Sequence, residues 1–95
     1  MNLAFTGPIF CWRGPAPYFF VTVPPDEAEE LQEAAAMVSY GWGMIPVKVL
    51  IGETEWTTSL WPRDGSYVVP LKDAIRKAEG IGEGDEVLIG LTVVI

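Results

Sequence analysis

Along most of the chain, apolar residues alternate with polar ones or gather in short β-branched and aromatic runs. Such patterns predict strands, because successive side chains of a strand point to opposite faces of a sheet and branched side chains suit its pleated surface. Clusters rich in glycine and proline separate the runs, as expected for turns. We therefore predict six strands, which cover residues 2–7, 18–23, 44–51, 54–61, 66–69 and 86–95.

Two segments have helical spacing instead. Residues 26–38 follow two prolines and carry an apolar residue every three or four positions, with acidic side chains over much of the remainder. A shorter segment between Pro70 and Gly80 repeats the pattern, and a glycine there is typical of a helix end. The predicted apolar stripes are Ala28, Leu31, Ala35 and Val38 in the first helix, and Leu71, Ala74 or Ile75, and Ala78 in the second.

The turns between these elements indicate how the strands pair. Gly52 with Glu53, and Asp64 with Gly65, are short connections that favour hairpins, so the strands over 44–51, 54–61 and 66–69 should be antiparallel. Pro70 is expected to end its strand. The last strand is apolar on both faces, which predicts burial on both sides by the rest of the chain or by a second copy.

One plan occurs twice in the predicted order ββαβββαβ: an aromatic and β-branched strand, a proline, a helix, a glycine and an apolar strand. Such self-similarity indicates an internal pseudo-repeat, and it predicts a barrel with pseudo-two-fold symmetry. We expect a mainly β fold of the α+β class, with two helices capping the barrel, in one domain over residues 1–95.

Composition narrows the functional classes. Thirteen acidic residues against six basic ones give a net charge of −7, which disfavours nucleic acid as a partner. The single Cys11 excludes an intramolecular disulfide and suggests a buried thiol in a reducing, cytoplasmic setting. The chain shows no signal peptide and no apolar stretch long enough to cross a membrane, so we expect a soluble protein.

The sequence offers little for catalysis. It contains no histidine, which removes the usual triads and the commonest general base, and one cysteine cannot build a thiolate metal site. We expect no metal and no cofactor. Carboxylates on the predicted hairpins leave a carboxylate-dependent enzyme as one alternative, with Glu53, Glu55 and Asp64 as its candidate residues.

The only basic cluster lies on the second helix. Lys72, Arg76 and Lys77 are the candidate nucleic-acid contacts in a DNA-binding alternative. Their neighbours favour a charge-balanced helix face, with Asp73 paired to Lys77 and Glu79 to Arg76.

Four tryptophans in 95 residues are the strongest sign of a binding site. Three of them occur at strand ends or in loops, where binding residues concentrate, and arginines accompany two of these. If the loops over 10–15, 40–44 and 60–65 gather at one end of the barrel, they form an aromatic pocket with a cationic rim. The candidate ligand-binding residues are Trp12, Arg13, Tyr40, Trp42, Trp61 and Arg63.

Three ordered segments, GWGMIPVKVLIG, TEWTTSLWP and GSYVVPLKDAIRKAEGIGEGDEV, resemble the DUF1905 family of small bacterial and archaeal proteins, also met beside YdeI/OmpD-associated proteins. The resemblance implies a small double-split β-barrel of about six strands with helices at its ends, and it implies no agreed activity. This chain departs from it in its acidic first helix and its short turn over 62–65.

Residues 65–89 also resemble one half of the swapped-hairpin DNA-binding domain of AbrB-type regulators, through Gly65, Val68, Val69, Pro70, Arg76, Gly80 and Gly84. The helix is about two residues longer here, and Ser66 stands where those regulators commonly carry arginine. The resemblance therefore implies the scaffold more than the DNA site.

The residues favour a non-enzymatic module that binds a small molecule or a protein partner through the aromatic pocket. An AbrB-like regulator and a carboxylate-dependent enzyme are the alternatives, and homodimerisation is a further expectation.

Overall fold

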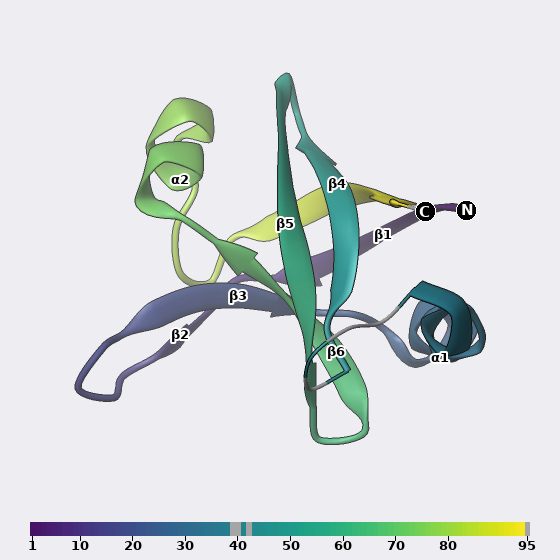
Figure 1. Cartoon of the computed structure of the whole chain (residues 1–95). Helices are drawn as coiled ribbons and strands as arrows, with labels where there is room; N and C mark the ends of the chain where they lie inside the picture. The colour runs from purple at the N-terminus through teal and green to yellow at the C-terminus, as the bar shows by residue number, and fades with distance from the viewer. Residues whose placement is uncertain (39–40, 42, 95) are drawn as a thin grey trace.

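Over the described part of the chain, seven strands and two helices follow one another (Figure 1). The computed structural model describes residues 1–38, 41 and 43–94. The strands are β1 (Asn2–Pro8), β2 (Phe10–Trp12), β3 (Tyr18–Thr22), β4 (Ile45–Ile51), β5 (Thr54–Arg63), β6 (Ser66–Leu71) and β7 (Glu86–Val93), and the helices are α1 (Pro25–Val38) and α2 (Asp73–Glu79).

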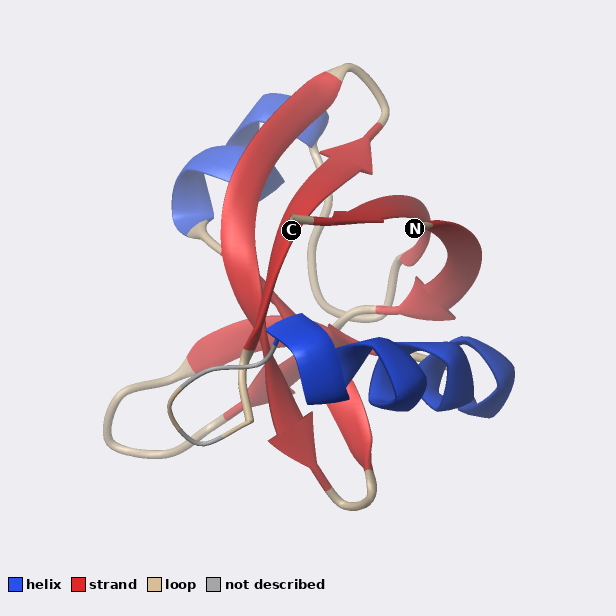
Figure 2. Ribbon diagram, turned by 45° about the vertical axis from the view of Figure 1, so that its right-hand side comes forward, coloured by secondary structure: helices blue, strands red, loops and turns tan. Residues whose placement is uncertain are grey.

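The strands form one antiparallel sheet in the order β1-β7-β4-β5-β6-β3-β2. The two edge strands, β1 and β2, are consecutive in the chain and are separated only by Ile9. The sheet therefore curls into a half-barrel, and β1 and β2 form one bent run of chain that connects its two edges (Figure 2). The prediction of a mainly β, barrel-like fold is confirmed. The predicted order lacked β2, because three residues after a proline carry too short a pattern to read.

Two long runs of chain each change partner along their length. The run β1–β2 pairs first with β7 and then with β3, whereas β5 pairs first with β4 and then, over its last residues, with β6. When the bent run is counted once, the barrel has six strand positions. The sheet therefore splits at two places, where a long strand leaves one neighbour.

A proline stands at each of these two places. The β5–β6 ladder extends to Trp61 and Val68, and the residue two positions further along β6 is Pro70. The β2–β3 ladder extends to Phe10, and the residue two positions earlier on that strand is Pro8. Proline has no N–H to donate to a ladder, so pairing stops there and the strands diverge.

The expectation that Pro70 ends its strand was wrong. Pro70 lies within β6 and faces Phe20 of β3, and the β3–β6 pairing continues to Leu71. The missing N–H affects only the edge toward β5. A proline can therefore end pairing with one neighbour while the strand continues along the other.

The pairings are consistent with the predicted pseudo-two-fold symmetry. The run β1–β2, β3, α1 and β4 forms one half, and β5, β6, α2 and β7 form the other. Strand β3 pairs with its counterpart β6, and β4 pairs with its counterpart β7. Each long run pairs with the last strand of the opposite half and with the next strand of its own half. Exchanging the halves leaves every pairing unchanged.

The barrel interior holds one core of branched side chains. Val47, Val49, Ile89 and Leu91 are buried on β4 and β7, and Leu31 of α1 packs into the same cluster. The outer side of β7 is not covered, since Leu88 is 64% exposed, and Val94 directly after the strand is also exposed. The expectation of burial on both faces of this strand is therefore wrong for the chain by itself.

The two helices contribute unequally. Helix α1 buries Ala28 and Leu31 as its spacing predicts, whereas α2 has no buried residue and its Ala74 and Ala78 are exposed. Gly80 ends α2 in the left-handed conformation, with φ of 65°, as predicted. Figure 1 shows the helices on opposite sides of the barrel. Neither of these described helices has the length and apolar content to cross a membrane.

The two residues where long strands change partner should matter equally. Ile9 and Leu60 are almost fully buried, and each adjoins one split. We expect Ile9→Ala and Leu60→Ala each to lower the free energy of unfolding by about 2 to 5 kcal/mol, measured by urea denaturation. The control Leu88→Ala should change it by less than about 0.5 kcal/mol. An effect at only one of the two residues would contradict their equivalence.

Stability should also fall in alkali through one buried phenol. Burial raises the pKa of Tyr67 above its usual 10.0. Below pH 10.0 the phenol is neutral in both folded and unfolded chains; above it, the unfolded chain ionises first, so stability declines until the folded-state pKa is passed. Urea midpoints measured at about pH 8 and about pH 11 should show a smaller loss for Tyr67→Phe than for the parent chain. Equal losses would contradict this account.

Candidate functional site

Five aromatic side chains gather on the outer side of the sheet, away from the barrel core. The Tyr18 ring is central, with its centroid 5.5 Å from Trp12, 5.4 Å from Phe20 and 5.2 Å from Trp61. Phe10 stacks on Phe20 at 5.8 Å. We call Phe10, Trp12, Tyr18, Phe20 and Trp61 the aromatic face.

The strand register places these residues together. Phe10 faces Phe20 and Trp12 faces Tyr18 across β2 and β3, and alternate residues of paired strands share one side of a sheet. Gly14 permits the position of Trp12, because a Cβ at residue 14 would overlap the indole. Trp12 and Trp61 remain partly open to solvent, with 39% and 36% of their surface exposed.

Arg63 belongs to this cluster, as the sequence predicts. Its Nη1 donates a hydrogen bond of 2.8 Å to the Tyr18 hydroxyl, and its guanidinium carbon lies 5.1 Å from the centroid of the Phe20 ring. Asp64 lies beside it, with 3.6 Å between Nε and Oδ2. Arg63 therefore joins β5 to β3 across the outer face.

Only some of the other predicted pocket residues lie near this cluster. Trp12, Trp61 and Arg63 come together around Tyr18, whereas Arg13 is exposed and forms an ion pair with Glu83, in the segment before β7. Tyr40 and Trp42 lie outside the described residues. Part of the predicted cluster thus exists, but it lies along the outer face of the sheet.

A groove of about 570 Å³ adjoins the aromatic face at the split between β5 and β6. We call it the split groove. Its volume is within the range of ordinary ligand sites. Residues of β5 form one wall, and the start of β3, the end of β6 and the first turn of α2 form the other. Its lining includes Tyr18, Phe19, Thr57, Trp61, Leu71, Lys72, Asp73 and Arg76.

A second groove, of about 580 Å³, lies between α1 and the β5–β6 hairpin and involves the equivalent parts of β3, β6 and α1. Tyr18 and Ser66 each begin their strand, and Arg76 and Ala28 are each the fourth residue of their helix. Thus Ser66 and Ala28 line the second groove where Tyr18 and Arg76 line the first. The fold therefore does not require an aromatic ring at the first position of these strands.

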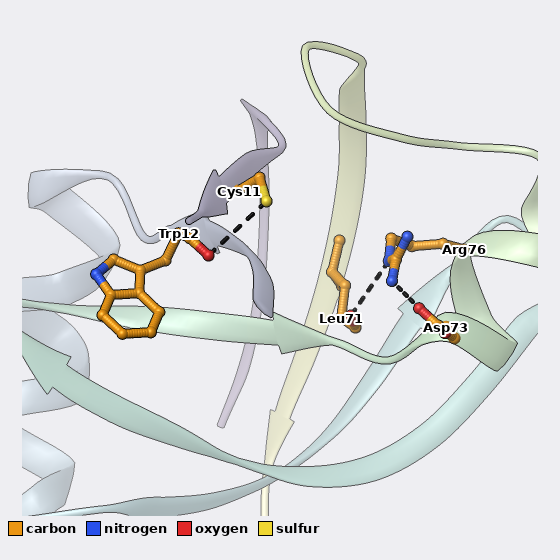
Figure 3. A network of polar contacts seen from close by, with 5 residues as sticks. All are labelled: Cys11, Trp12, Leu71, Asp73 and Arg76. Carbon is orange, nitrogen blue, oxygen red and sulfur yellow. Dashed lines mark hydrogen bonds and ion pairs between the residues drawn. The ribbon is translucent and has the colours of Figure 1, made fainter. Parts of the chain in front are cut away.

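The predicted basic cluster on α2 is not a free cationic surface. The Arg76 guanidinium carbon lies 3.6 Å from the centroid of the Phe19 ring, and its Nε donates to the Leu71 carbonyl oxygen at 3.4 Å. It also forms an ion pair with Asp73 (Figure 3). The expected pairings were wrong, because the i,i+3 Asp73 holds Arg76 and Glu79 instead accepts a hydrogen bond from Thr54.

Lys72, which directly precedes α2, and Lys77 on the helix remain exposed, and no ion pair among the described residues involves either of them. Only Lys72 lines the split groove. The groove therefore has one lysine at its rim and an arginine already held in its wall.

The candidate catalytic carboxylates do not converge. Glu53 and Asp64 are in the turns at opposite ends of the ten-residue β5, roughly 30 Å apart, and Glu55 is exposed on its outer side. Within the described ranges, no three metal-binding side chains lie close enough to hold an ion. Cys11 is half-buried, rather than buried as expected, with its Sγ 3.8 Å from the Trp12 carbonyl oxygen (Figure 3).

Tyr18, the central residue of the site, was not predicted from the sequence. Tyr18 and Phe20 were included only as strand formers, and Phe10 was not distinguished from its neighbours. The signal that could have found them is the alternation of aromatics, at residues 10 and 12 and again at 18 and 20. Two such strands place their aromatic sides together once they pair.

The comparison with protein families is consistent with this architecture. The family model described as a domain of unknown function, DUF1905, matches residues 5–91. The chain belongs to the DUF1905 family. The match spans both halves of the barrel and both walls of the split groove. The family description assigns no activity, and no curated protein matches this chain.

Arg76 should act in this DUF1905 chain as a structural residue. Its side chain is 18% exposed and covers Phe19, so Arg76→Gln should lower the free energy of unfolding by about 1 to 2 kcal/mol. Arg76→Lys should lie between that variant and the parent, because lysine lacks the planar guanidinium. The control Lys77→Gln should change stability by less than about 0.5 kcal/mol in the same urea titration. Equal effects at residues 76 and 77 would contradict the assignment.

Proposed function

We propose that this DUF1905 domain is a non-enzymatic binding module, and that the split groove with its aromatic face is the binding surface. The occupant is a small molecule or a segment of a partner protein, with an apolar or aromatic group against Tyr18 and Trp61 and an acidic group toward Lys72. Aromatic faces and a cation at a groove rim suit such a ligand.

The observation that carries the proposal is the difference between the two grooves at the parts of β3, β6 and the helices that they share. The barrel tolerates Ser66 where the other groove has Tyr18, so stability of the fold does not explain the tyrosine ring at that position. Among the described residues, the exposed tryptophans are Trp12 and Trp61, and their place beside the first groove points in the same direction. Residues that the scaffold does not need are best explained by an occupant.

The alternatives receive less support. An enzyme that uses Glu53, Glu55 and Asp64 would have to bring together carboxylates that β5 separates. A DNA-binding role would depend on Lys72, Arg76 and Lys77, yet Arg76 is held by Phe19 and Asp73. The net charge of −7 also opposes a polyphosphate partner.

The proposal includes a cytoplasmic setting, supported by the single cysteine, and self-association through the outer side of the sheet. Leu50 and Leu88 are exposed there, on β4 and β7. Native mass spectrometry of gently purified protein reports both the number of subunits and any retained ligand.

A screen of one-ring and two-ring aromatic carboxylates, followed by amide chemical shifts, tests the binding role. Compounds that bind should change the amide chemical shifts of residues that line the split groove, and they should change tryptophan fluorescence. Trp61→Ala should lower the affinity for these compounds by about tenfold or more, since the lost aromatic contact removes roughly 1.4 kcal/mol of binding free energy.

Trp12→Ala should lower the affinity for the same compounds less, because Trp12 packs on Tyr18 without lining the groove. Leu88→Ala should leave the affinity unchanged. Shifts that map to the second groove, or equal affinity for the parent and Trp61→Ala, would place the site elsewhere.

A further inference from the structure

One edge of β5 carries backbone groups that no strand pairs. The turn of Gly52 and Glu53 joins β4 to β5, and the flanking Ile51 and Thr54 face each other. In a two-residue hairpin the flanking pair exchanges hydrogen bonds, and such pairs alternate along the ladder. Trp56 and Thr58 therefore direct their N–H and C=O groups toward β4.

It follows that Glu55 and Thr57 direct their backbone groups to the other side of β5. Among the described strands, β6 alone pairs on that side, and its ladder stops at Trp61. Among the described residues, the backbone hydrogen bonds found outside the ladders involve neither Glu55 nor Thr57. An unpaired edge of this kind is a template for an added strand.

The split groove lies directly along this edge. Thr57 and Trp61 line one wall, while Tyr18, Leu71 and Lys72 line the other. Helix α2 limits the groove beyond Thr57, because Glu79 accepts a hydrogen bond from Thr54. The space therefore suits a short segment whose outer side chains contact Tyr18 and Trp61.

We propose that the split groove binds an extended peptide segment of a partner protein, which adds to β5 as a strand. The inference rests on the proposed binding role of the groove and specifies its occupant. Strand addition draws affinity from main-chain hydrogen bonds and specificity from alternate side chains. The segment has an aromatic or branched residue against Tyr18 and Trp61, an acidic residue near Lys72, and no proline where it pairs with β5.

A peptide explains the edge better than a small ring compound does. A ring on Tyr18 and Trp61 would leave the backbone groups of Thr57 unpaired, whereas an extended strand offers them a donor and an acceptor. Lys72 is the charged side chain at the rim that forms no ion pair with the described residues, so it favours an acidic segment.

The first experiment measures amide hydrogen exchange by NMR in the free protein. The amides of Glu55 and Thr57 should exchange at least about tenfold faster than those of Trp56 and Thr58, which differ from them in facing β4. Equal protection of Thr57 and Thr58 would overturn the open edge. Protection of Thr57 that rises with protein concentration would identify a second copy as the occupant, and would overturn the peptide proposal.

The second experiment uses a peptide selected from a random octapeptide phage library on the immobilised full chain. The selected peptide, made synthetically, should protect the Thr57 amide about tenfold or more and bind Trp61→Ala more weakly. N-methylation of single peptide amides should reduce affinity by about tenfold at alternate positions, because only every second amide faces β5.

The outcomes separate this inference from the proposed function. If aromatic carboxylates bind in the groove while no peptide is enriched, or while the selected peptide leaves Thr57 exchange unchanged, the binding role stands and strand addition is overturned. If the selected peptide shifts only residues outside the groove, both are overturned. A uniform N-methyl effect, without alternation, would also exclude strand addition.

Discussion

The missing N–H of two prolines determines the shape of this barrel. Pro8 and Pro70 each lie two residues beyond the end of a ladder, at the position where the next hydrogen-bonded pair would form. In each case one long strand then lies against a different neighbour. Without Pro70, the ladder between β5 and β6 could continue beyond Trp61 and Val68 to the end of β6 at Leu71. The splits arise from backbone chemistry, and the split groove occupies the place that one of them leaves open.

The pseudo-two-fold arrangement separates what the fold needs from what it does not. Both halves bury branched residues at matching places, as with Val47 and Val49 of β4 and Val87 and Ile89 of β7, because the two strands close one core. The grooves have diverged around this shared interior. Tyr18 and Arg76 line one groove, and Ser66 and Ala28 occupy the corresponding positions in the other. A single scaffold therefore supports two different surfaces.

The local sequence pattern predicted most helices and strands, but it predicted little of how the strands pair and which side chains meet. Alternation and turn residues placed six strands and both helices to within a few residues, and the repeated proline-to-glycine plan predicted the symmetry. The effect of Pro70 was misjudged because register, which a single strand does not carry, decides which edge loses its donor. Tyr18 was missed for the same reason, since its ring becomes central only when β2 pairs with β3 and β6 brings β5 close to them. The tryptophans were chosen for their loop positions, and two of them do reach the site.

The aromatic face forms a layer of its own. Phe20 and Val68 are buried, yet they lie outside the main core cluster, on the opposite side of the sheet from Val21 and Val69. A small barrel gains little stability from a second apolar layer that stays partly exposed, and exposed aromatics carry a risk of aggregation. Retaining that layer beside an unpaired strand edge makes sense if a partner covers both at once, because the same contact would satisfy the backbone of β5 and bury the rings of Tyr18 and Trp61.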